Sequence, residues 1–192
     1  MDLPIYMATV NEEDTDSGIS FMSLVDKPAI KKDFLAFSEK QNYAIQSEDK
    51  RIITGAAMIA DLPIYRKDDE RGEYYIVFSA ETIWSLAKKF SREQRYSAVN
   101  TNHTDEVESL NMIESYFVNR ERGINPPKGF EEVPDGSWFV SYLVDNDEVW
   151  AKVKAGEFKG FSIEGFFGVE NQSLRAAKDL LAEIENFRTS LN

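Results

Sequence analysis

The stretch Gly-Glu-Phe-Lys-Gly-Phe-Ser-Ile-Glu-Gly-Phe-Phe, residues 156–167, carries a single hydroxyl side chain, Ser162, between Gly160 and Gly165. Its composition predicts a β-strand in which Ser162 and Glu164 share one face. The opposite face is the better core candidate and carries apolar side chains: Phe161, Ile163 and Phe167. The two glycines permit close backbone approach, which suits either oxyanion donors or a β-bulge or tight bend.

The residues just before this stretch predict a strand followed by a short helix. Residues 138–144 are apolar on both faces, as expected for a buried strand. Asp145 can cap a helix over 146–155, and Gly156 suits the C-terminal end of that helix. The Ser162 strand would follow at once.

Farther upstream, β-rich runs surround one more amphipathic helix. Ser79 can cap a helix over 80–91, in which apolar residues recur at helical spacing. The charged run 66–71 predicts a loop, and the Gly- and Pro-rich residues 120–136 predict no regular element. The predicted strands cover 52–59, 74–78, 96–103 and 110–118.

This order of elements predicts an α+β domain over 50–170, a small, mostly antiparallel β-barrel or strongly curved sheet with peripheral helices. Residues 1–49 are interpreted as an N-terminal extension with a hairpin and a linker, because two apolar stretches flank an acidic turn at 11–18. Within the C-terminal part, 171–192, we expect a helix over 173–189 that docks on the domain or joins a homo-oligomer.

The chemistry that Ser162 could perform depends on a base. A serine hydroxyl becomes a useful nucleophile only beside a general base, and the chain's one histidine, His103, is the obvious candidate. The alternative is an edge serine and an unrelated surface histidine. A third group should orient the imidazole, and we expect Glu114 first, Glu164 second, with Asp105 or a water as further choices.

Composition restricts the other kinds of site. The chain has 192 residues, of which 42% are hydrophobic and 12% aromatic, enough for one domain with a real core. It has no cysteine, which excludes disulfides, thiol nucleophiles and cysteine-ligated metals. We expect no cofactor and no metal, and a metal or carboxylate hydrolase lacks a clustered ligand motif.

The charge balance restricts the partners. The net charge of −12 repels phosphate backbones and anionic lipid headgroups, so nucleic acid and membrane are not expected partners. The start of the sequence lacks the basic and apolar regions of a signal peptide, and no apolar run approaches about 20 residues. The sequence therefore predicts a protein of the cytoplasm.

One long and specific stretch runs from Val144-Asp-Asn-Asp-Glu through Lys-Gly-Phe-Ser-Ile-Glu-Gly-Phe-Phe167. Shorter stretches accompany it: Ser-Leu-Val-Asp-Lys-Pro-Ala-Ile (23–30), Asp-Leu-Pro-Ile-Tyr-Arg (61–66), Tyr-Tyr-Ile-Val-Phe-Ser (74–79), Asn-His-Thr-Asp (102–105), Glu-Ser-Tyr-Phe-Val (114–118) and Gly-Ser-Trp-Phe-Val (136–140). Together they resemble the capsid maturation proteases of tailed phages, the prohead serine proteases, specifically their XkdF-type branch.

A remoter similarity to the herpesvirus assemblins rests on the same order of a histidine segment, a helix and a Gly-x-Ser strand. These resemblances imply a small β-barrel with peripheral helices and neighbouring strands that carry His103 as the catalytic histidine and Ser162 as the nucleophile. Two departures stand out. Assemblins have a second histidine after the serine, and this chain has none. Thr104 also separates the histidine from Asp105.

The resemblance further implies substrates and a location. The substrates would be phage major capsid and scaffolding proteins, cleaved in the host cytoplasm inside the immature prohead. A catalytically inactive structural or scaffolding component on the same fold is the alternative, since function resides in the site and not in the fold.

Overall fold

The computed structural model describes residues 3–26, 43–47, 50–103, 105–106 and 110–172. In this part of the chain the strands form three four-stranded sheets. The first has the order β12 (Gly168–Asn171), β1 (Ile5–Thr9), β6 (Gly72–Val77) and β5 (Ile64–Asp68). The second has the order β3 (Tyr43–Ser47), β4 (Ile52–Met58), β10 (Trp138–Val144) and β9 (Leu110–Phe117). The third has the order β11 (Gly160–Phe166), β2 (Gly18–Val25), β7 (Val99–Thr101) and β8 (Asp105–Glu106).

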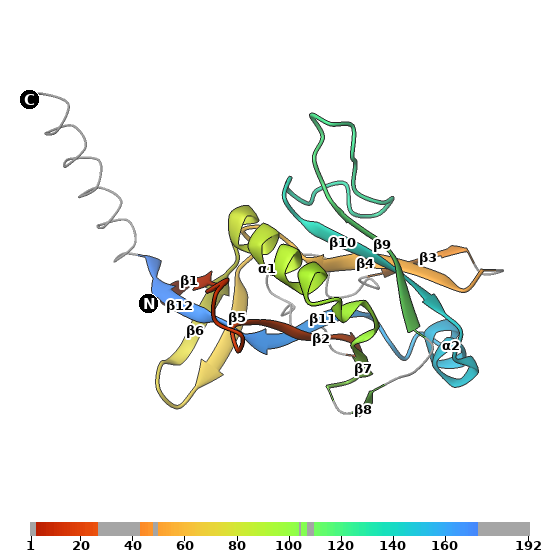
Figure 1. Cartoon of the computed structure of the whole chain (residues 1–192), viewed down its shortest axis with the longest axis horizontal. Coiled ribbons are helices and arrows are strands. Elements are labelled where there is room, and N and C mark those ends of the chain that lie inside the picture. Colours follow the sequence, from red (N-terminus) through yellow and green to blue (C-terminus); the bar gives the residue numbers. More distant parts are fainter. Residues whose placement is uncertain (1–2, 27–42, 48–49, 104, 107–109, 173–192) are drawn as a thin grey trace, which may run out of the picture.

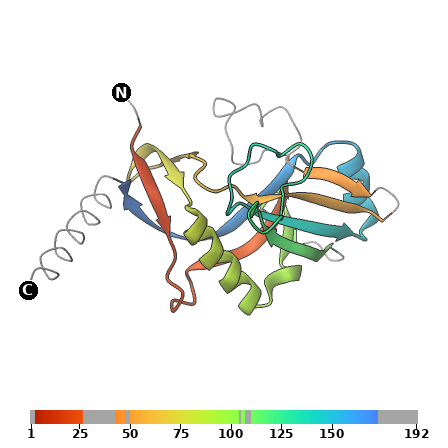
Figure 2. The same cartoon turned by 90° about the horizontal axis from the view of Figure 1, so that it is seen from above.

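The sheets are arranged along the long axis of the molecule. Figure 1 shows the first sheet at one end, the second sheet with α2 (Asp147–Lys154) at the other, and β2 and β11 running between them. Figure 2, the view from above, shows the same elongated arrangement. Most pairings are antiparallel, and the β1–β6 and β2–β7 pairs are parallel. The predicted α+β class and mostly antiparallel pairing agree with this architecture.

The predicted closed barrel is not found in the described residues. The β11 strand packs against β4, but no ladder of backbone hydrogen bonds joins the two in the described part of the chain. Side chains and an open cavity separate these strands, so the three sheets curve around a shared core without closing. That core includes Phe161, and Ile163 packs against it, which confirms the face of β11 predicted to be buried.

The predicted N-terminal hairpin is wrong. Its two stretches form β1 and β2, but these strands lie in different sheets and do not pair with each other. The β1 strand lies between β12 and β6, and β2 lies between β11 and β7. Both strands are therefore interior members of sheets, which an extension would not be. The sequence showed two β-type runs around a turn, but it did not show that each run has its partners elsewhere.

The predicted loop at 66–71 is also wrong, because β5 and β6 form a hairpin there. Arg66 pairs with Tyr74, and Asp68 pairs with Gly72. The Asp68 carboxylate accepts hydrogen bonds from the backbone N–H groups of Glu70 and Arg71, which fixes the turn. Charged residues on the edge strand hid the alternation that marks a strand.

Both helices predicted within the described residues are present. The α1 helix (Ala80–Arg92) begins after Ser79, whose hydroxyl accepts from the backbone N–H of Thr82 as predicted. The cap of α2 differs from the prediction, since Asn146 rather than Asp145 accepts the first backbone N–H groups. A short 3-10 helix, η2 (Arg95–Ser97), and a turn at 102–103 replace most of the strand predicted over 96–103. The helix predicted over 173–189 lies outside the described residues.

Residues 120–136 form no helix or strand, as predicted, but hydrogen bonds and apolar packing hold them in place. Arg120 donates to the Asp135 carboxylate and to the carbonyl oxygens of Glu131 and Val133. Phe130 and Val133 pack in a small second core with Phe139 and others. The loop thereby becomes a fixed wall beside β4.

Among the described residues, no helix has the length and apolar content to cross a membrane.

Candidate active site

The β11 strand places Ser162 beside a second serine. Ser162 lies directly opposite Ser23 of β2, so both side chains project from the same face of the sheet. The register shifts between Glu164 and Gly165. A Cβ atom on Gly165 would lie 1.9 Å from the carbonyl oxygen of Gly18, so glycine is required there by close packing on β2. Gly165 thus serves the bulge, the structural one of its two predicted roles.

His103 reaches this face from the turn between β7 and β8. Asn102 and His103 both have left-handed backbone conformations, with φ of 48° and 60°. Such conformations are costly outside glycine, and they persist where surrounding contacts enforce them. The backbone N–H of Asn102 donates to the Leu24 carbonyl oxygen, and its side-chain oxygen accepts from the backbone N–H of Asp26. These two bonds hold the histidine turn against the end of β2.

Four polar side chains converge at this point. His103 Nδ1 lies 2.9 Å from Glu164 Oε1 and 3.1 Å from Ser23 Oγ. The Ser23 hydroxyl lies 2.7 Å from the same carboxylate oxygen and 2.5 Å from Asn100 Oδ1. The Asn100 amide also donates to Glu164 Oε1. Glu164 therefore accepts from residues on β2, β7 and the histidine turn at once.

The surroundings of Glu164 keep it ionised. Burial raises the pKa of Glu164, but hydrogen bonds from Ser23, Asn100 and His103 together outweigh burial, and the pKa ends below its usual value. The side chains of His103 and Glu164 are 43% and 31% exposed, so solvent and ligands can reach this side of the cluster. An ionised carboxylate against Nδ1 suits an imidazole that acts as a base through Nε2.

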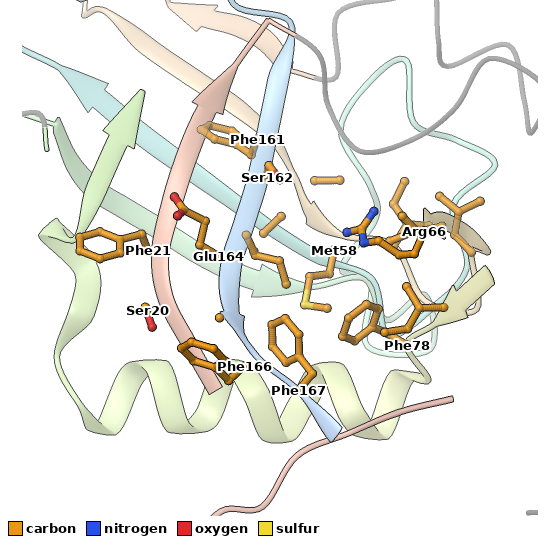
Figure 3. Close-up of a pocket in the computed structure, with 18 of the residues that line it drawn as sticks. Ser20, Phe21, Met58, Arg66, Phe78, Phe161, Ser162, Glu164, Phe166 and Phe167 are labelled. Carbon is orange, nitrogen blue, oxygen red and sulfur yellow. The ribbon is translucent and has the colours of Figure 1, made fainter. Parts of the chain in front are cut away.

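A cavity of about 620 Å³ lies beside β11, and Ser162 and Glu164 are among its lining residues. Figure 3 shows the two side chains on β11, with the Glu164 carboxylate over β2 and the Arg66 side chain on the far side of the cavity. Ser162 is half-buried, and in the described structure its hydroxyl has no hydrogen bond to His103. The two predicted catalytic residues thus lie on one face of the sheet with β2 between them, and they do not contact each other directly.

The preferred third residue lies elsewhere. Glu114 is on β9 in the second sheet, where it pairs with Ser141 of β10 and accepts a hydrogen bond from the Ser141 hydroxyl. It does not orient His103 in this structure. Asp105 follows the histidine turn on β8, where it pairs with Thr101. Glu164, the second choice from the sequence, is the carboxylate that contacts the imidazole.

Sequence reasoning missed Ser23 and Asn100. Ser23 is completely buried, and Asn100 is 5% exposed. Ser23 lies within the largely apolar strand β2, which was a usable signal, whereas Asn100 lies in the three-residue strand β7, Val-Asn-Thr, where no apolar run marks it. However, their meeting depends on the parallel β2–β7 pairing, in which Ser23 aligns with Asn100. A pairing between segments 77 positions apart leaves no trace in local periodicity.

Comparison with known proteins identifies one family and two relatives. A family model described as "Putative phage serine protease XkdF" matches residues 40–170. The chain is 30% identical over 157 residues to the phage-like element PBSX protein XkdF of Bacillus subtilis (strain 168), covering 77% of this chain and 52% of that protein. It is 27% identical over 158 residues to the protein YqbD of the same organism, covering 77% and 44%. The chain thus spans about half the length of these curated relatives. No solved structure matches it.

Proposed function

This chain belongs to the family described as "Putative phage serine protease XkdF", and on that premise we propose that it is an endopeptidase with Ser162 as nucleophile and His103 as general base. The resemblance to the XkdF-type proteins predicted from the sequence is confirmed at the level of the family. Glu164, in place of the expected Glu114, is the orienting carboxylate of the proposal.

The observation that carries the proposal is the 2.9 Å contact between His103 Nδ1 and Glu164 Oε1. An ionised Glu164 accepts the Nδ1 hydrogen bond, so the neutral imidazole keeps its lone pair on Nε2. Nε2 then takes the Ser162 proton as Oγ attacks a peptide carbonyl carbon, and it later returns the proton to the leaving amine. Water then attacks the acyl-enzyme, with the same imidazole as its general base, and releases Ser162. Glu164 stabilises the imidazolium that forms in each step.

The proposal requires a side-chain movement. His103 Nδ1 faces Ser23 and Glu164, and Ser162 lies one strand beyond Ser23. Rotation of the exposed imidazole around the Glu164 contact would carry Nε2 over β2 towards Ser162. Catalytic hydrogen bonds commonly tighten only when substrate is bound.

Ser23 is the weaker candidate for the nucleophile, although it lies nearer to the imidazole. It is completely buried, and its hydroxyl is shared among Asn100, His103 and Glu164. A nucleophile must reach a substrate carbonyl, and Ser162 lines the cavity whereas Ser23 does not. In the proposal Ser23 positions Glu164 and the histidine turn.

The substrates we propose are segments of the phage major capsid and scaffolding proteins, cleaved inside the immature prohead in the host cytoplasm. The family name supports a phage protein as substrate class. The resemblance of the Ser162 strand to prohead proteases supports the capsid and scaffold assignment. Neither nucleic acid nor membrane is a partner in this proposal, as the charge of −12 disfavours both.

Co-expression tests the reaction. The protein is produced with its capsid and scaffolding partners as wild type, Ser162→Ala, His103→Ala and, as a matched control, Ser97→Ala, which alters an exposed serine outside the site. We expect truncated partner proteins with wild type and Ser97→Ala, and intact partners with the other two. The Ser162→Ala, His103→Ala double variant should be little worse than either single variant, since the pair acts as a unit.

A serine-directed probe identifies the nucleophile. An alkyl fluorophosphonate should form one adduct that peptide mapping places on Ser162, and His103→Ala should abolish it. An adduct on Ser23 would transfer the nucleophile role to that residue. Full-length partners with the wild-type protein, combined with no adduct, would instead favour the inactive structural component.

A further inference from the structure

Arg66 is a charged residue in a mostly apolar cavity. It lies on β5, is half-buried, and lines the cavity that Ser162 lines from the opposite side (Figure 3). One guanidinium nitrogen donates to the carbonyl oxygen of Tyr65 at 3.1 Å. Apolar side chains form most of the surrounding wall: Met58, Leu62, Ile76, Phe78 and Phe167.

Arg66 differs from the arginines that stabilise the fold. Arg51, Arg71 and Arg120 each lie within ion-pair distance of a carboxylate. Within the described ranges no carboxylate lies within that distance of Arg66. Burial lowers the pKa of Arg66 from its usual value, although an arginine stays charged near neutral pH. Among the described residues, the partly desolvated guanidinium thus has a backbone carbonyl but no carboxylate as its partner, which leaves it able to pair with an acidic group of a ligand.

The cavity's own acid is not available to Arg66. Glu164 also lines the cavity, but its Oε1 accepts hydrogen bonds from Ser23 and Asn100 and contacts His103. Its carboxylate lies over β2, and the Arg66 side chain enters from the other side (Figure 3). Among the described residues, the acid that lines the cavity is therefore engaged away from Arg66.

The walls of the cavity suit an extended peptide. One edge of β11 pairs with β2, and its other edge faces β4 across the cavity. Over Ala56 to Met58, β4 pairs with β10, lines the cavity, and has no second strand partner among the described residues. Exposed strand edges offer backbone donors and acceptors to an added strand.

We propose that this cavity binds an extended peptide segment through the pairing of an acidic side chain, Asp or Glu, with Arg66. The inference rests on the proposed function, since this segment is the stretch cleaved at Ser162. A guanidinium matches a carboxylate with two parallel hydrogen bonds, and the apolar wall strengthens such a pair by excluding water. Because the chain carries a net charge of −12, it repels acidic ligands elsewhere, and their retention depends on Arg66.

A binding experiment tests the inference without requiring cleavage. Immobilised Ser162→Ala protein is incubated with libraries of acetylated and amidated hexapeptides, in which one position is fixed as Glu or Gln and the others are mixed. Blocked ends leave the side chain as the acidic group, and mass spectrometry measures retention. At one position we expect Glu peptides to be retained about tenfold or more over Gln peptides, as charged hydrogen bonds allow.

Three further variants, one of them a control, assign the selection to Arg66. Arg66→Gln, added to the Ser162→Ala protein, should abolish the preference for Glu peptides. The matched control is Lys67→Gln, which removes a positive charge from the next position of β5, where the side chain is 68% exposed and does not line the cavity. It should keep the preference. Arg66→Lys keeps the charge but loses the paired geometry, so it should show an intermediate preference.

Equal retention of Glu and Gln peptides at every position would overturn the inference, and that comparison requires no variant of Arg66. A preference that persists in Arg66→Gln would overturn it as well. Cleavage of the partner proteins without Glu selection would leave the protease proposal standing and reject this one. Selection of Glu peptides, combined with no cleavage by the wild-type protein, would support this inference and reject the protease proposal.

Discussion

The hydroxyl of Tyr142 is an uncompensated polar group in the core. The residue is fully buried, and its oxygen has no hydrogen-bond partner among the described residues. Burial raises the pKa of Tyr142, which keeps the group neutral. Tyr142→Phe should therefore increase the free energy of unfolding by about 1 kcal/mol, measured by urea unfolding. Tyr74→Phe is the opposite case, because it breaks the 2.9 Å bond to Asp68 and should decrease stability by about the same amount. Lower stability in both variants would show that Tyr142 has an unrecognised partner.

Glu164 links the site to the acid stability of the protein. Its pKa is lower in the folded protein than the ordinary value of a glutamate in the unfolded chain, because hydrogen bonds to its carboxylate outweigh the effect of burial. Its contribution to stability is therefore complete above the unfolded value and is lost as the pH falls through the folded value. The difference in free energy of unfolding between wild type and Glu164→Gln should shrink as the pH falls from about 6 to about 3. The control Glu132→Gln alters an exposed carboxylate and should give no such trend. A difference that stays constant for Glu164→Gln would contradict the assigned hydrogen bonds.

At the scale of elements, a buried lysine joins α1 to the turn between β1 and β2. Lys89 is 7% exposed, and its ammonium group donates to the backbone carbonyl oxygens of Asn11, Asp14 and Ser17. Lys89→Met keeps the apolar stem but leaves these oxygens without their donor, so we expect a loss of about 2 kcal/mol in the free energy of unfolding. Faster hydrogen exchange in the turn should accompany it. Lys88→Met, which breaks a more exposed ion pair with Glu12, should cost below about 1 kcal/mol. Equal losses would show that the carbonyl contacts add nothing.

How far each element was predictable depended on how local its signals are. The α1 helix follows from the Ser79 cap and an apolar stripe, and β11 follows from one run of β-type residues. The carboxylate of the site depends on which strands become neighbours. Glu114 was preferred because its strand follows His103 in the sequence, but β9 joins the sheet of β10 while β7 joins that of β2. No feature within either strand distinguishes these two pairings.

At the scale of the whole molecule, the N-terminal strands are structural requirements. A fragment that begins at residue 50 would lack β2, and β11 would then lose the strand on which it pairs and the Ser23 hydroxyl beneath Glu164. We expect this fragment to show no cooperative thermal unfolding and no fixed aromatic environment in near-ultraviolet circular dichroism. The full chain is the control. A fragment that unfolds cooperatively like the full chain would restore the interpretation of residues 1–49 as an extension.

The hydrogen bond between Ser23 and Glu164 joins residues 141 positions apart, which has a consequence for the timing of biosynthesis. A ribosome adds about 5–20 residues per second, so roughly 7–28 s separate the synthesis of these two side chains. During that interval β2 exists without β11, and the His103 imidazole lacks its Glu164 partner. If Ser162 and His103 act as proposed, a nascent chain cannot cleave a substrate prematurely, and peptidase activity begins only after the Ser162 strand has emerged and paired.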